Sequence, residues 1–255
     1  MLSAAPDFLS DTHVHSTFSD GRDTIEENVA QARRRGLHRI CLVDHVRTTT
    51  TWVGDFVAAT QALAATDRGS HEVPLEILRG VETKVLDQKG GLDLPADLGG
   101  LDRILVADHQ FPMADGPHHP KEVEADRAAG RYRDAELADV LIESVGNSLP
   151  AVAGRGILAH MFSVLPKVGM AETDLSPAGL DWLADECLAF DVVLEVNERW
   201  ACPSPSTLAH FMARGVRIVC ATDSHRAETI GVYEKVRSIV DEATVLAEGA
   251  ERQDV

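Results

Sequence analysis

Short apolar runs alternate with amphipathic stretches along most of this chain. Between the apolar runs, hydrophobic side chains recur at helical spacing in Thr24–Arg35, Asp55–Thr66, Tyr132–Leu149, Ser176–Ala189 and Ser204–Arg214. The runs themselves have the length and composition of buried strands: Phe8–His13, Arg39–Val43, Leu75–Val81, Arg103–Ala107, Gly156–His160, Val192–Val196 and Val216–Ala221. Strands that are joined by helices predict a single parallel sheet.

The helix ends carry their own signals. Thr24 has the side chain of a helix cap, and Glu27 stands at the position that completes a capping box. Pro177 and Pro205 suit the first turn of a helix. These signals support the helix boundaries that the apolar spacing predicts.

The strand count favours an α/β fold in which the parallel sheet closes into a distorted barrel of seven strands. We expect a single domain over residues 1–247, since 255 residues with 44% hydrophobic content suffice for one large core. The stretch from 110 to 131 is rich in Pro, His, Gly and Asp, and is too long for an ordinary connection. We expect it to be a lid-like insertion over the mouth of the barrel. Residues 248–255 read as a polar tail.

Composition narrows the classes of function. The net charge of −17 argues against a protein that binds a nucleic acid polymer, which needs a basic surface. No apolar run approaches the roughly 18–20 residues that cross a membrane, and the first residues do not resemble a signal peptide. The four cysteines have no CxxC spacing, so we expect reduced thiols and a cytoplasmic location.

Side chains that bind metals stand at or just after the end of every predicted strand. Because the carboxyl ends of parallel strands meet on one face of a barrel, we expect these side chains to converge. His13 and His15 are two residues apart, which puts both imidazoles on the same side of a strand. The set is His13 and His15, Asp44 and His45, Glu82, Asp108 and His109, His160, Glu195 and Asn197, and Asp223 and His225.

Each of these residues also has an ordinary structural interpretation. Asp44 and Asp108 could cap the segments that follow them, and Glu195 could pair with Arg199 or Arg226. Imidazole is a good ligand for zinc, iron and manganese, and a carboxylate such as Asp20 suits the harder metals. The whole set therefore predicts a metal site at the mouth of the barrel.

The motifs together resemble the PHP (polymerase and histidinol phosphatase) family of metal-dependent phosphoesterases. His13-Val14-His15 with Ser19-Asp20-Gly21 matches the opening motif of that family, and Asp44-His45 matches the second. The later motifs are matched by Gly80-Val81-Glu82, His109, His160 and Asp223-Ser224-His225. The resemblance covers the chain from Asp11 to Arg226.

The resemblance implies a distorted, TIM-like (β/α)7 barrel that holds two or three divalent metal ions: Mn, Fe or Zn. It would place one metal on His13, His15, Glu82 and Asp223. Glu82 would bridge to a second metal on His109 and His160, and a third would lie on Asp20, His45 and His225. Asp20 stands where some members have a histidine, which favours manganese or iron at the third position.

The resemblance further implies hydrolysis of a small-molecule phosphate monoester by metal-activated hydroxide. Arg199 and Arg226 lie close in sequence to the predicted ligands, and an arginine fork matches the geometry of a phosphate group. We expect these two residues to bind the substrate. The proton for the leaving group could come from Asp108 or from a histidine next to the metals.

Other functions stay open on sequence alone. The same ligands could open a cyclic phosphodiester, hydrolyse a nucleoside bisphosphate or cleave a C–N bond, because metal-bound hydroxide also attacks carbonyl groups. The barrel could instead be a metal-binding regulatory protein without activity. The expected partner is a small phosphorylated molecule and not a membrane. The sequence does not indicate an oligomeric state.

Overall fold

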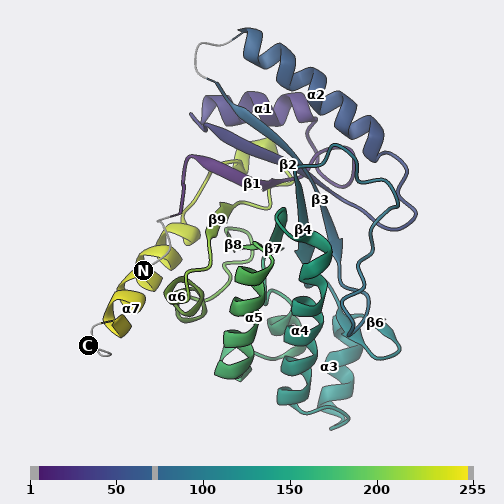
Figure 1. Ribbon diagram of the computed structural model, residues 1–255, viewed down its shortest axis with the longest axis vertical. Coiled ribbons are helices and arrows are strands. Elements are labelled where there is room, and N and C mark those ends of the chain that lie inside the picture. The colour runs from purple at the N-terminus through teal and green to yellow at the C-terminus, as the bar shows by residue number, and fades with distance from the viewer. Residues whose placement is uncertain (1–5, 71–73, 252–255) are drawn as a thin grey trace.

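The computed structural model describes residues 6–70 and 74–251 of the chain. Its main sheet has seven parallel strands in the order β1-β2-β3-β4-β7-β8-β9 (Figure 1). The strands are β1 (Ser10–Val14), β2 (Arg39–His45), β3 (Glu76–Lys84), β4 (Arg103–Ala107), β7 (Gly156–Ala159), β8 (Val193–Asn197) and β9 (Ile218–Ala221). The predicted α/β fold and its strands are confirmed, each within a few residues of the expected ends.

The first and last strands of the sheet meet and nearly close it into a barrel. The Thr12 hydroxyl donates to the carbonyl of Cys220 in β9 at 2.9 Å. Beyond β9, the His15 amide donates to the Ser224 carbonyl at 2.8 Å, and the Ser224 amide donates to the His13 carbonyl at 3.2 Å. The register between β1 and β2 shifts between Asp11 and Val14. These contacts confirm the predicted distorted barrel, whose closing seam lies beside His13 and His15.

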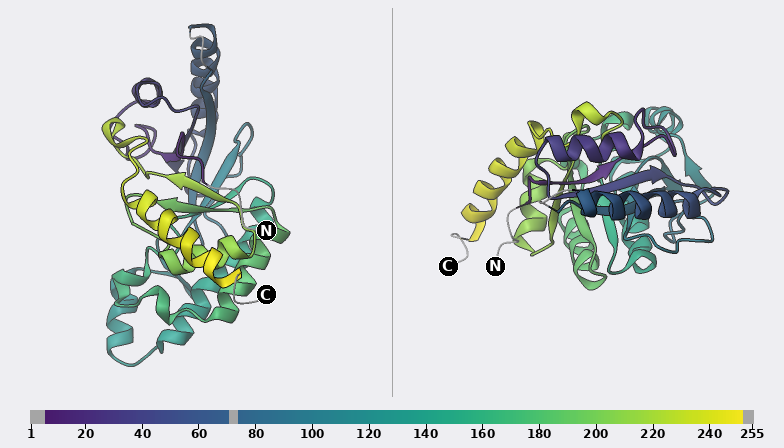
Figure 2. Two further views of the ribbon diagram at one scale, coloured as in Figure 1. Left: turned by 90° about the vertical axis from the view of Figure 1, so that its left-hand side faces the viewer. Right: turned by 90° about the horizontal axis from the view of Figure 1, so that it is seen from above.

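The helices lie on the outside of the barrel, as the two rotated views show (Figure 2). Five of them match the predicted segments: α1 (Ile25–Arg34), α2 (Val53–Ser70), α4 (Asp134–Ser148), α5 (Pro177–Ala189) and α6 (Pro205–Ala213). Thr24 and Glu27 form the predicted capping box of α1, with the Thr24 amide donating to Glu27 at 2.8 Å. Pro177 and Pro205 begin their helices as expected. In the described part of the chain, four short 3-10 helices complete the connections: η1 (Leu149–Val152), η2 (Leu165–Val168), η3 (Glu172–Asp174) and η4 (Ala227–Thr229).

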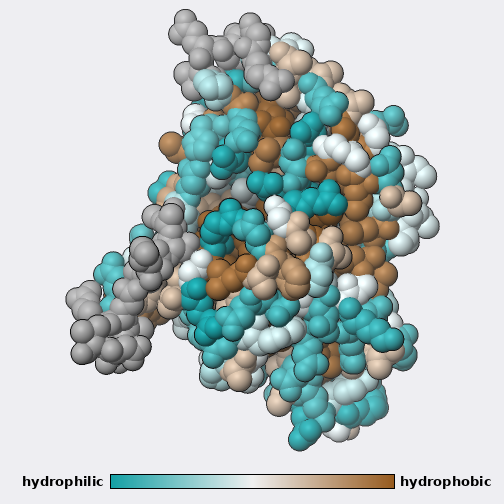
Figure 3. All heavy atoms as spheres, viewed as in Figure 1, coloured by the Kyte–Doolittle hydropathy of each residue, from teal (hydrophilic) through white to brown (hydrophobic). Residues whose placement is uncertain are grey.

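Hydrophobic side chains form two packed regions. A small core fills the inside of the barrel with Cys41, Val43, Leu105, Ala107, Ile157, Ala159 and Val193. A larger core lies between the strands and the surrounding helices. The outer face over α3, α4 and α5 is mostly polar (Figure 3).

The stretch from 110 to 131 has more regular structure than we expected. It forms an antiparallel hairpin of β5 (Phe111–Met113) and β6 (Gly116–His118), followed by α3 (Pro120–Ala128). Gly116 adopts a φ of 125° at the turn, a conformation that side chains other than glycine rarely adopt. His119 caps α3, and its Nδ1 accepts from the Lys121 amide at 3.2 Å.

The last helix, α7 (Lys235–Glu251), was not predicted from the sequence. It packs against α6 and runs along one side of the barrel (Figures 1 and 2). Residues 248–251 of the predicted polar tail belong to this helix, and residues 252–255 lie outside the described residues. None of the helices in the described part of the chain is both long and apolar enough to cross a membrane.

Candidate metal centre

The buried carboxylate of Glu82 lies at the centre of the convergent side chains. Glu82 is in β3 and is 2% exposed. Its oxygens lie within 3.4 Å of nitrogens on five imidazoles, because the neighbouring strands all end around it. These imidazoles belong to His13 (3.3 Å), His15 (3.4 Å), His45 (2.9 Å), His109 (3.1 Å) and His160 (2.9 Å). One carboxylate thus contacts residues that lie in or just after β1, β2, β4 and β7.

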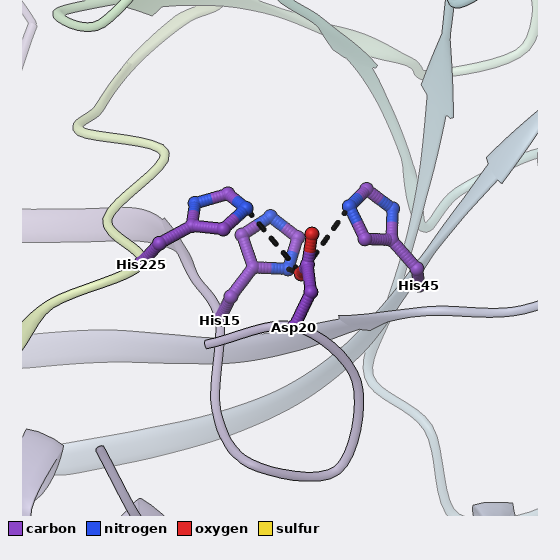
Figure 4. A group of neighbouring side chains, drawn as sticks. All are labelled: His15, Asp20, His45 and His225. Carbon is purple, nitrogen blue, oxygen red and sulfur yellow. Dashed lines mark ion pairs between the residues drawn. The ribbon is translucent and has the colours of Figure 1, made fainter. Parts of the chain in front are cut away.

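Three histidines surround the Asp20 carboxylate at the mouth of the barrel. Its Oδ1 lies 3.3 Å from His225 Nε2, 3.6 Å from His45 Nε2 and 3.9 Å from His15 Nδ1. The four side chains point toward one another from the two ends of the chain (Figure 4). Asp20 and His225 are neighbours because the loop after β1 packs against the loop after β9.

Asp223 lies on the other side of His15. Its Oδ1 is 3.2 Å from His15 Nε2 and 4.0 Å from His13 Nε2. Its Oδ2 accepts a hydrogen bond of 2.8 Å from the indole N–H of Trp200. The backbone of Asp223 has a φ of 51°, an uncommon conformation for a residue with a side chain. The strained backbone turns this carboxylate into the site.

The described residues contain three groups whose ligand atoms lie within 4.8 Å of one another: His13, His15 and Asp223; His45, Glu82 and His109; and His15, Asp20, His45 and His225. All nine side chains that the sequence indicated therefore come together, with His160 held on Glu82. These three groups divide the side chains differently from the assignment of ligands to metals that the family resemblance implied. His15 and His45 each lie between two groups, whereas that assignment gave each histidine to one metal.

The side chains fit divalent cations. Neither buried ring nitrogen of His15 makes a hydrogen bond of good geometry in the described structure, although oxygens of Asp223 and Glu82 lie 3.2 and 3.4 Å from Nε2. Buried polar atoms that lack well-formed hydrogen bonds are costly, and a cation shared with these carboxylates would satisfy the imidazole. Imidazole nitrogens mixed with carboxylate oxygens are suitable ligands for manganese, iron and zinc.

Burial and neighbouring charges shift the pKa values of the cluster. Burial lowers the pKa of His15 to about 4. Burial also acts to lower the pKa of His160, but Asp108 and Glu82 raise it to about 10. Although burial acts to raise the pKa of Glu82, the charges of His13 and His109 hold it well below its usual value. Protons on imidazoles thus balance the carboxylates, and bound cations would displace such protons.

Glu195 supports this cluster from behind, which corrects the alternative that it pairs with Arg199 or Arg226. Its Oε2 lies 3.0 Å from His13 Nδ1. Its Oε1 accepts from the His160 amide at 3.0 Å and from the Asn197 side chain at 2.6 Å. Glu195 is fully buried in β8. With Nδ1–H directed to Glu195, His13 presents Nε2 to Glu82 and Asp223.

Asp108 also lies outside the cluster. It does not line either of the two cavities that border the cluster. Its carboxylate is buried and lies 3.3 Å from His160 Nδ1. It accepts from the Ser163 hydroxyl at 2.9 Å and from the Val164 amide at 3.1 Å. This position suits a residue that orients His160 better than one that donates a proton to a leaving group.

The two arginines differ in their distance from the cluster. Arg199 Nη1 lies 2.6 Å from His225 Nδ1 and 3.5 Å from Asp223 Oδ1. Arg226 is more peripheral, and its Nη1 lies 3.4 Å from Glu228. Both line a cavity of about 510 Å³ on the Asp223 side of the cluster. A second cavity of about 630 Å³ opens next to His45 and His109.

Asp44 holds the loop that carries Asp20, a function that the sequence did not reveal. Its oxygens accept from the amides of Ser16 and Ser19 at 3.0 and 3.1 Å and from both serine hydroxyls. Asp44 does not touch the cluster. Its position next to His45 and the two serines before Asp20 were the only signals, and they do not specify the contact.

Comparisons with known proteins agree with this arrangement. The model of the PHP domain matches residues 11–172, more than half of the chain. A probable phosphatase of Thermoanaerobacter sp. is 35% identical over 106 residues, which cover 39% of this chain and 40% of the relative. The match thus spans well under two thirds of that relative. A probable phosphatase of Acetivibrio thermocellus is 23% identical over 250 residues, covering 94% of this chain and 89% of the relative.

One further relative and one solved structure extend the comparison. A phosphoribosyl 1,2-cyclic phosphate 1,2-diphosphodiesterase of Eggerthella lenta is 30% identical over 83 residues, 32% of this chain and 27% of the relative. The crystal structure of a candidate histidinol phosphatase from Listeria monocytogenes superposes with a TM-score of 0.61 at 13% identity, covering 88% of this chain and 97% of that one. This likeness shows the shared fold. With its matched domain and its convergent histidines and carboxylates, the chain belongs to the PHP domain family.

Proposed function

We propose that this protein is a metal-dependent phosphoesterase that hydrolyses a small-molecule phosphate monoester. The observation that carries the proposal is the ring of five imidazoles around the buried Glu82 carboxylate. A structural role alone does not explain so many ionisable groups in one place, because burying them without cations is costly. The phosphatase names of the relatives agree with this function.

The residues that would hold the metals are His13, His15, Asp20, His45, Glu82, His109, His160, Asp223 and His225. We propose two or three divalent cations, of manganese, iron or zinc. Glu82 would be shared between sites, since each of its oxygens faces a different set of imidazoles. Bound cations of this kind supply positive charge for a phosphoryl group and lower the pKa of a coordinated water.

The remaining residues would bind and orient. Arg199 lies beside His225 and Asp223, where its guanidinium could donate two hydrogen bonds to phosphoryl oxygens. Arg226 would add positive charge at the rim of the same cavity. Glu195 would hold His13, and Asp108 would hold His160, so that each histidine presents Nε2 to the site. Asp108 thus takes a positioning role in this proposal.

A cyclic phosphodiester is a second candidate substrate. The Eggerthella lenta relative is named for such a reaction, although the alignment covers a minor part of either chain. The two cavities that border the cluster, one at His45 and His109 and one at Asp223 and His225, would admit the two ester arms of such a molecule. The two substrate classes can be compared in the same assay.

The proposal is tested by removing and restoring metal. The purified protein is stripped with a chelator, reloaded with manganese, iron or zinc, and assayed with p-nitrophenyl phosphate and a panel of monoesters and cyclic diesters. We expect turnover only in reloaded protein, and we expect Glu82→Gln to lose metal and turnover together. Glu76→Gln, at the other end of β3 and exposed, is the matched control.

Two results would contradict the proposal. Metal content that is unchanged in Glu82→Gln would remove the ligand assignment. Stoichiometric metal in the wild-type protein without turnover of any ester would favour the metal-binding regulatory role instead.

A further inference from the structure

The two cavities beside the metal cluster have different linings. The cavity on the Asp223 side is bordered mainly by charged and hydroxyl side chains, including Arg199, Arg226 and Lys235. The cavity of about 630 Å³ beside His45 and His109 is also bordered mostly by polar and charged side chains, but unlike the first it has aromatic rings in its lining, those of Phe18 and Trp52. A volume of this size suits a small organic molecule. The organic part of a substrate would therefore lie in the second cavity, with its phosphate at the cluster.

Phe18 and Trp52 form a wall that is fixed in place. Their ring centroids are 5.6 Å apart, and both rings pack on Phe56, at 5.3 Å from Phe18 and 5.9 Å from Trp52. Phe56 is fully buried in the main core. Phe18 and Trp52 are each half-buried, so each leaves part of its surface at the cavity. A rigid aromatic surface at the edge of a highly polar site favours a flat ring as its ligand.

Two positively charged side chains, Arg47 and Lys84, line the same cavity. Arg47 follows β2 and has no carboxylate within ion-pair distance among residues 6–70 and 74–251. Lys84 lies at the end of β3, 3.7 Å from an Asp93 oxygen. An arginine without a carboxylate partner next to an aromatic wall suits a ring that carries an anionic or hydrogen-bond-accepting group.

We propose that the Trp52 wall selects phosphate esters whose alcohol carries a planar aromatic ring, and that Arg47 favours an acidic substituent on that ring. This inference rests on the proposed phosphoesterase function, because it takes the phosphate to lie at the cluster. The ring would stack on Trp52, and the substituent would accept hydrogen bonds from the Arg47 guanidinium. Trp52 is then a residue that determines specificity and takes no part in the chemical step.

Binding of phosphonates tests the wall without turnover. Benzylphosphonate and cyclohexylmethylphosphonate have similar size and charge, and only the first has a flat ring. We expect the metal-loaded wild-type protein to bind benzylphosphonate at least about fivefold more tightly, as measured by calorimetry. Trp52→Leu should bring this ratio close to one, and Trp52→Phe should retain most of it. Metal content is measured in each variant.

Arg47 is tested with a carboxylate on the ring. We expect 4-carboxybenzylphosphonate to bind more tightly than benzylphosphonate to the wild-type protein, because Arg47 would pair with the carboxylate. Arg47→Gln should remove this gain and leave the preference for the flat ring. The hydrolysis rates of benzyl phosphate and cyclohexylmethyl phosphate, whose leaving groups are both primary alkoxides, are compared in parallel.

The outcomes separate this inference from the proposed function. The proposed selection by Trp52 is wrong if the wild-type protein binds the two phosphonates equally, or if Trp52→Leu keeps the preference for the flat ring. Either result would hold even if the protein hydrolyses esters. Failure of both phosphonates to bind overturns the proposed selection as well. Ring-selective binding that Trp52→Leu removes, in a protein that hydrolyses no ester, supports the wall and contradicts the phosphoesterase function.

Discussion

Glu195 shows how a residue outside the cluster can set the strength of metal binding. Its carboxylate lies 3.0 Å from His13 Nδ1 and fixes which ring nitrogen faces Glu82. Loss of such a supporting contact typically lowers metal affinity by 10–100-fold. We expect Glu195→Gln to weaken metal binding by about tenfold or more, because the amide has no charge to stabilise the ligated imidazole. Competition with a chelator of known affinity measures the change.

Glu198→Gln is the control for this variant. Glu198 lies three residues along the chain and accepts from the amides of Lys235 and Val236 at the start of α7. Its substitution should lower stability without changing metal affinity. Equal metal affinity in Glu195→Gln and the wild-type protein would mean that Glu195 is only a buried partner in the fold.

Trp200 supports Asp223 in a similar way. Its indole N–H donates to Asp223 Oδ2 at 2.8 Å, which leaves Oδ1 facing His15. Trp200→Phe removes the donor and keeps most of the ring. We expect metal affinity to fall by about tenfold, while the unfolding temperature of the metal-free protein changes little. Trp182→Phe, in α5 and remote from the cluster, should leave metal affinity unchanged. A Trp200→Phe variant that binds metal as tightly as the control would contradict this role.

The sequence could predict the candidate ligands but not the residues that support them. His13, Glu82 and His160 follow from their positions near the ends of apolar runs, because parallel strands end on one face. The contact between Glu195 and His13 joins residues 182 positions apart and depends on the order of the strands and the angle of each side chain. Trp200 reaches Asp223 from a loop whose shape no periodicity specifies.

At the scale of elements, Asp11 holds the closing seam of the barrel. This buried carboxylate of β1 accepts from the Thr222 amide at 3.0 Å, the Thr222 hydroxyl at 2.6 Å and the Gly231 amide at 3.0 Å. It thereby ties the first strand to the segment that follows the last. Burial raises the pKa of Asp11 from 3.8 to about 6, although these hydrogen bonds act to lower it.

Because the pKa of Asp11 is raised in the folded state, the stability that Asp11 gives to the barrel should depend on pH. Between about pH 4 and 6 the folded protein holds a proton on Asp11 that the unfolded chain has released, so stability falls as the pH rises. The stability that the protonated Asp11 adds to the folded state is complete below about pH 4 and is lost above about pH 6. We expect the free energy of unfolding of metal-free wild-type protein to fall, relative to Asp11→Asn, by roughly 3 kcal/mol over this range. Urea unfolding at several pH values measures it. If the difference in free energy of unfolding between wild-type protein and Asp11→Asn stays constant with pH, the raised pKa of Asp11 is contradicted.

The elements differed in how well the sequence predicted them. The strands were predictable because each is a short apolar run, and α1 was predictable because Thr24 and Glu27 form its cap. Helix α7 was missed although its buried residues, Val236, Ile239, Val240, Ala243 and Ala247, have helical spacing. The hairpin of β5 and β6 was missed because its strands have three residues each, too few to show a period.

At the scale of the whole molecule, the cluster joins elements from both ends of the chain. His15 and Asp20 lie in the loop after β1, and His225 lies in the loop after β9. An unfolded chain cannot hold these side chains around one ion, so cations would bind the folded state far better than the unfolded state. Any metal that is bound should therefore stabilise the entire barrel.

We expect the unfolding temperature to rise with the concentration of the bound metal and to fall on addition of a chelator. A ligand at 100 times its dissociation constant adds about 2.7 kcal/mol to the free energy of unfolding. For a protein of this size that corresponds to roughly 5–10 °C, which differential scanning calorimetry resolves easily. Asp223→Asn should abolish most of the shift, because it removes a carboxylate charge from the seam between the two ends of the chain. An unfolding temperature that neither metal nor chelator moves would mean that the convergent side chains hold no cation.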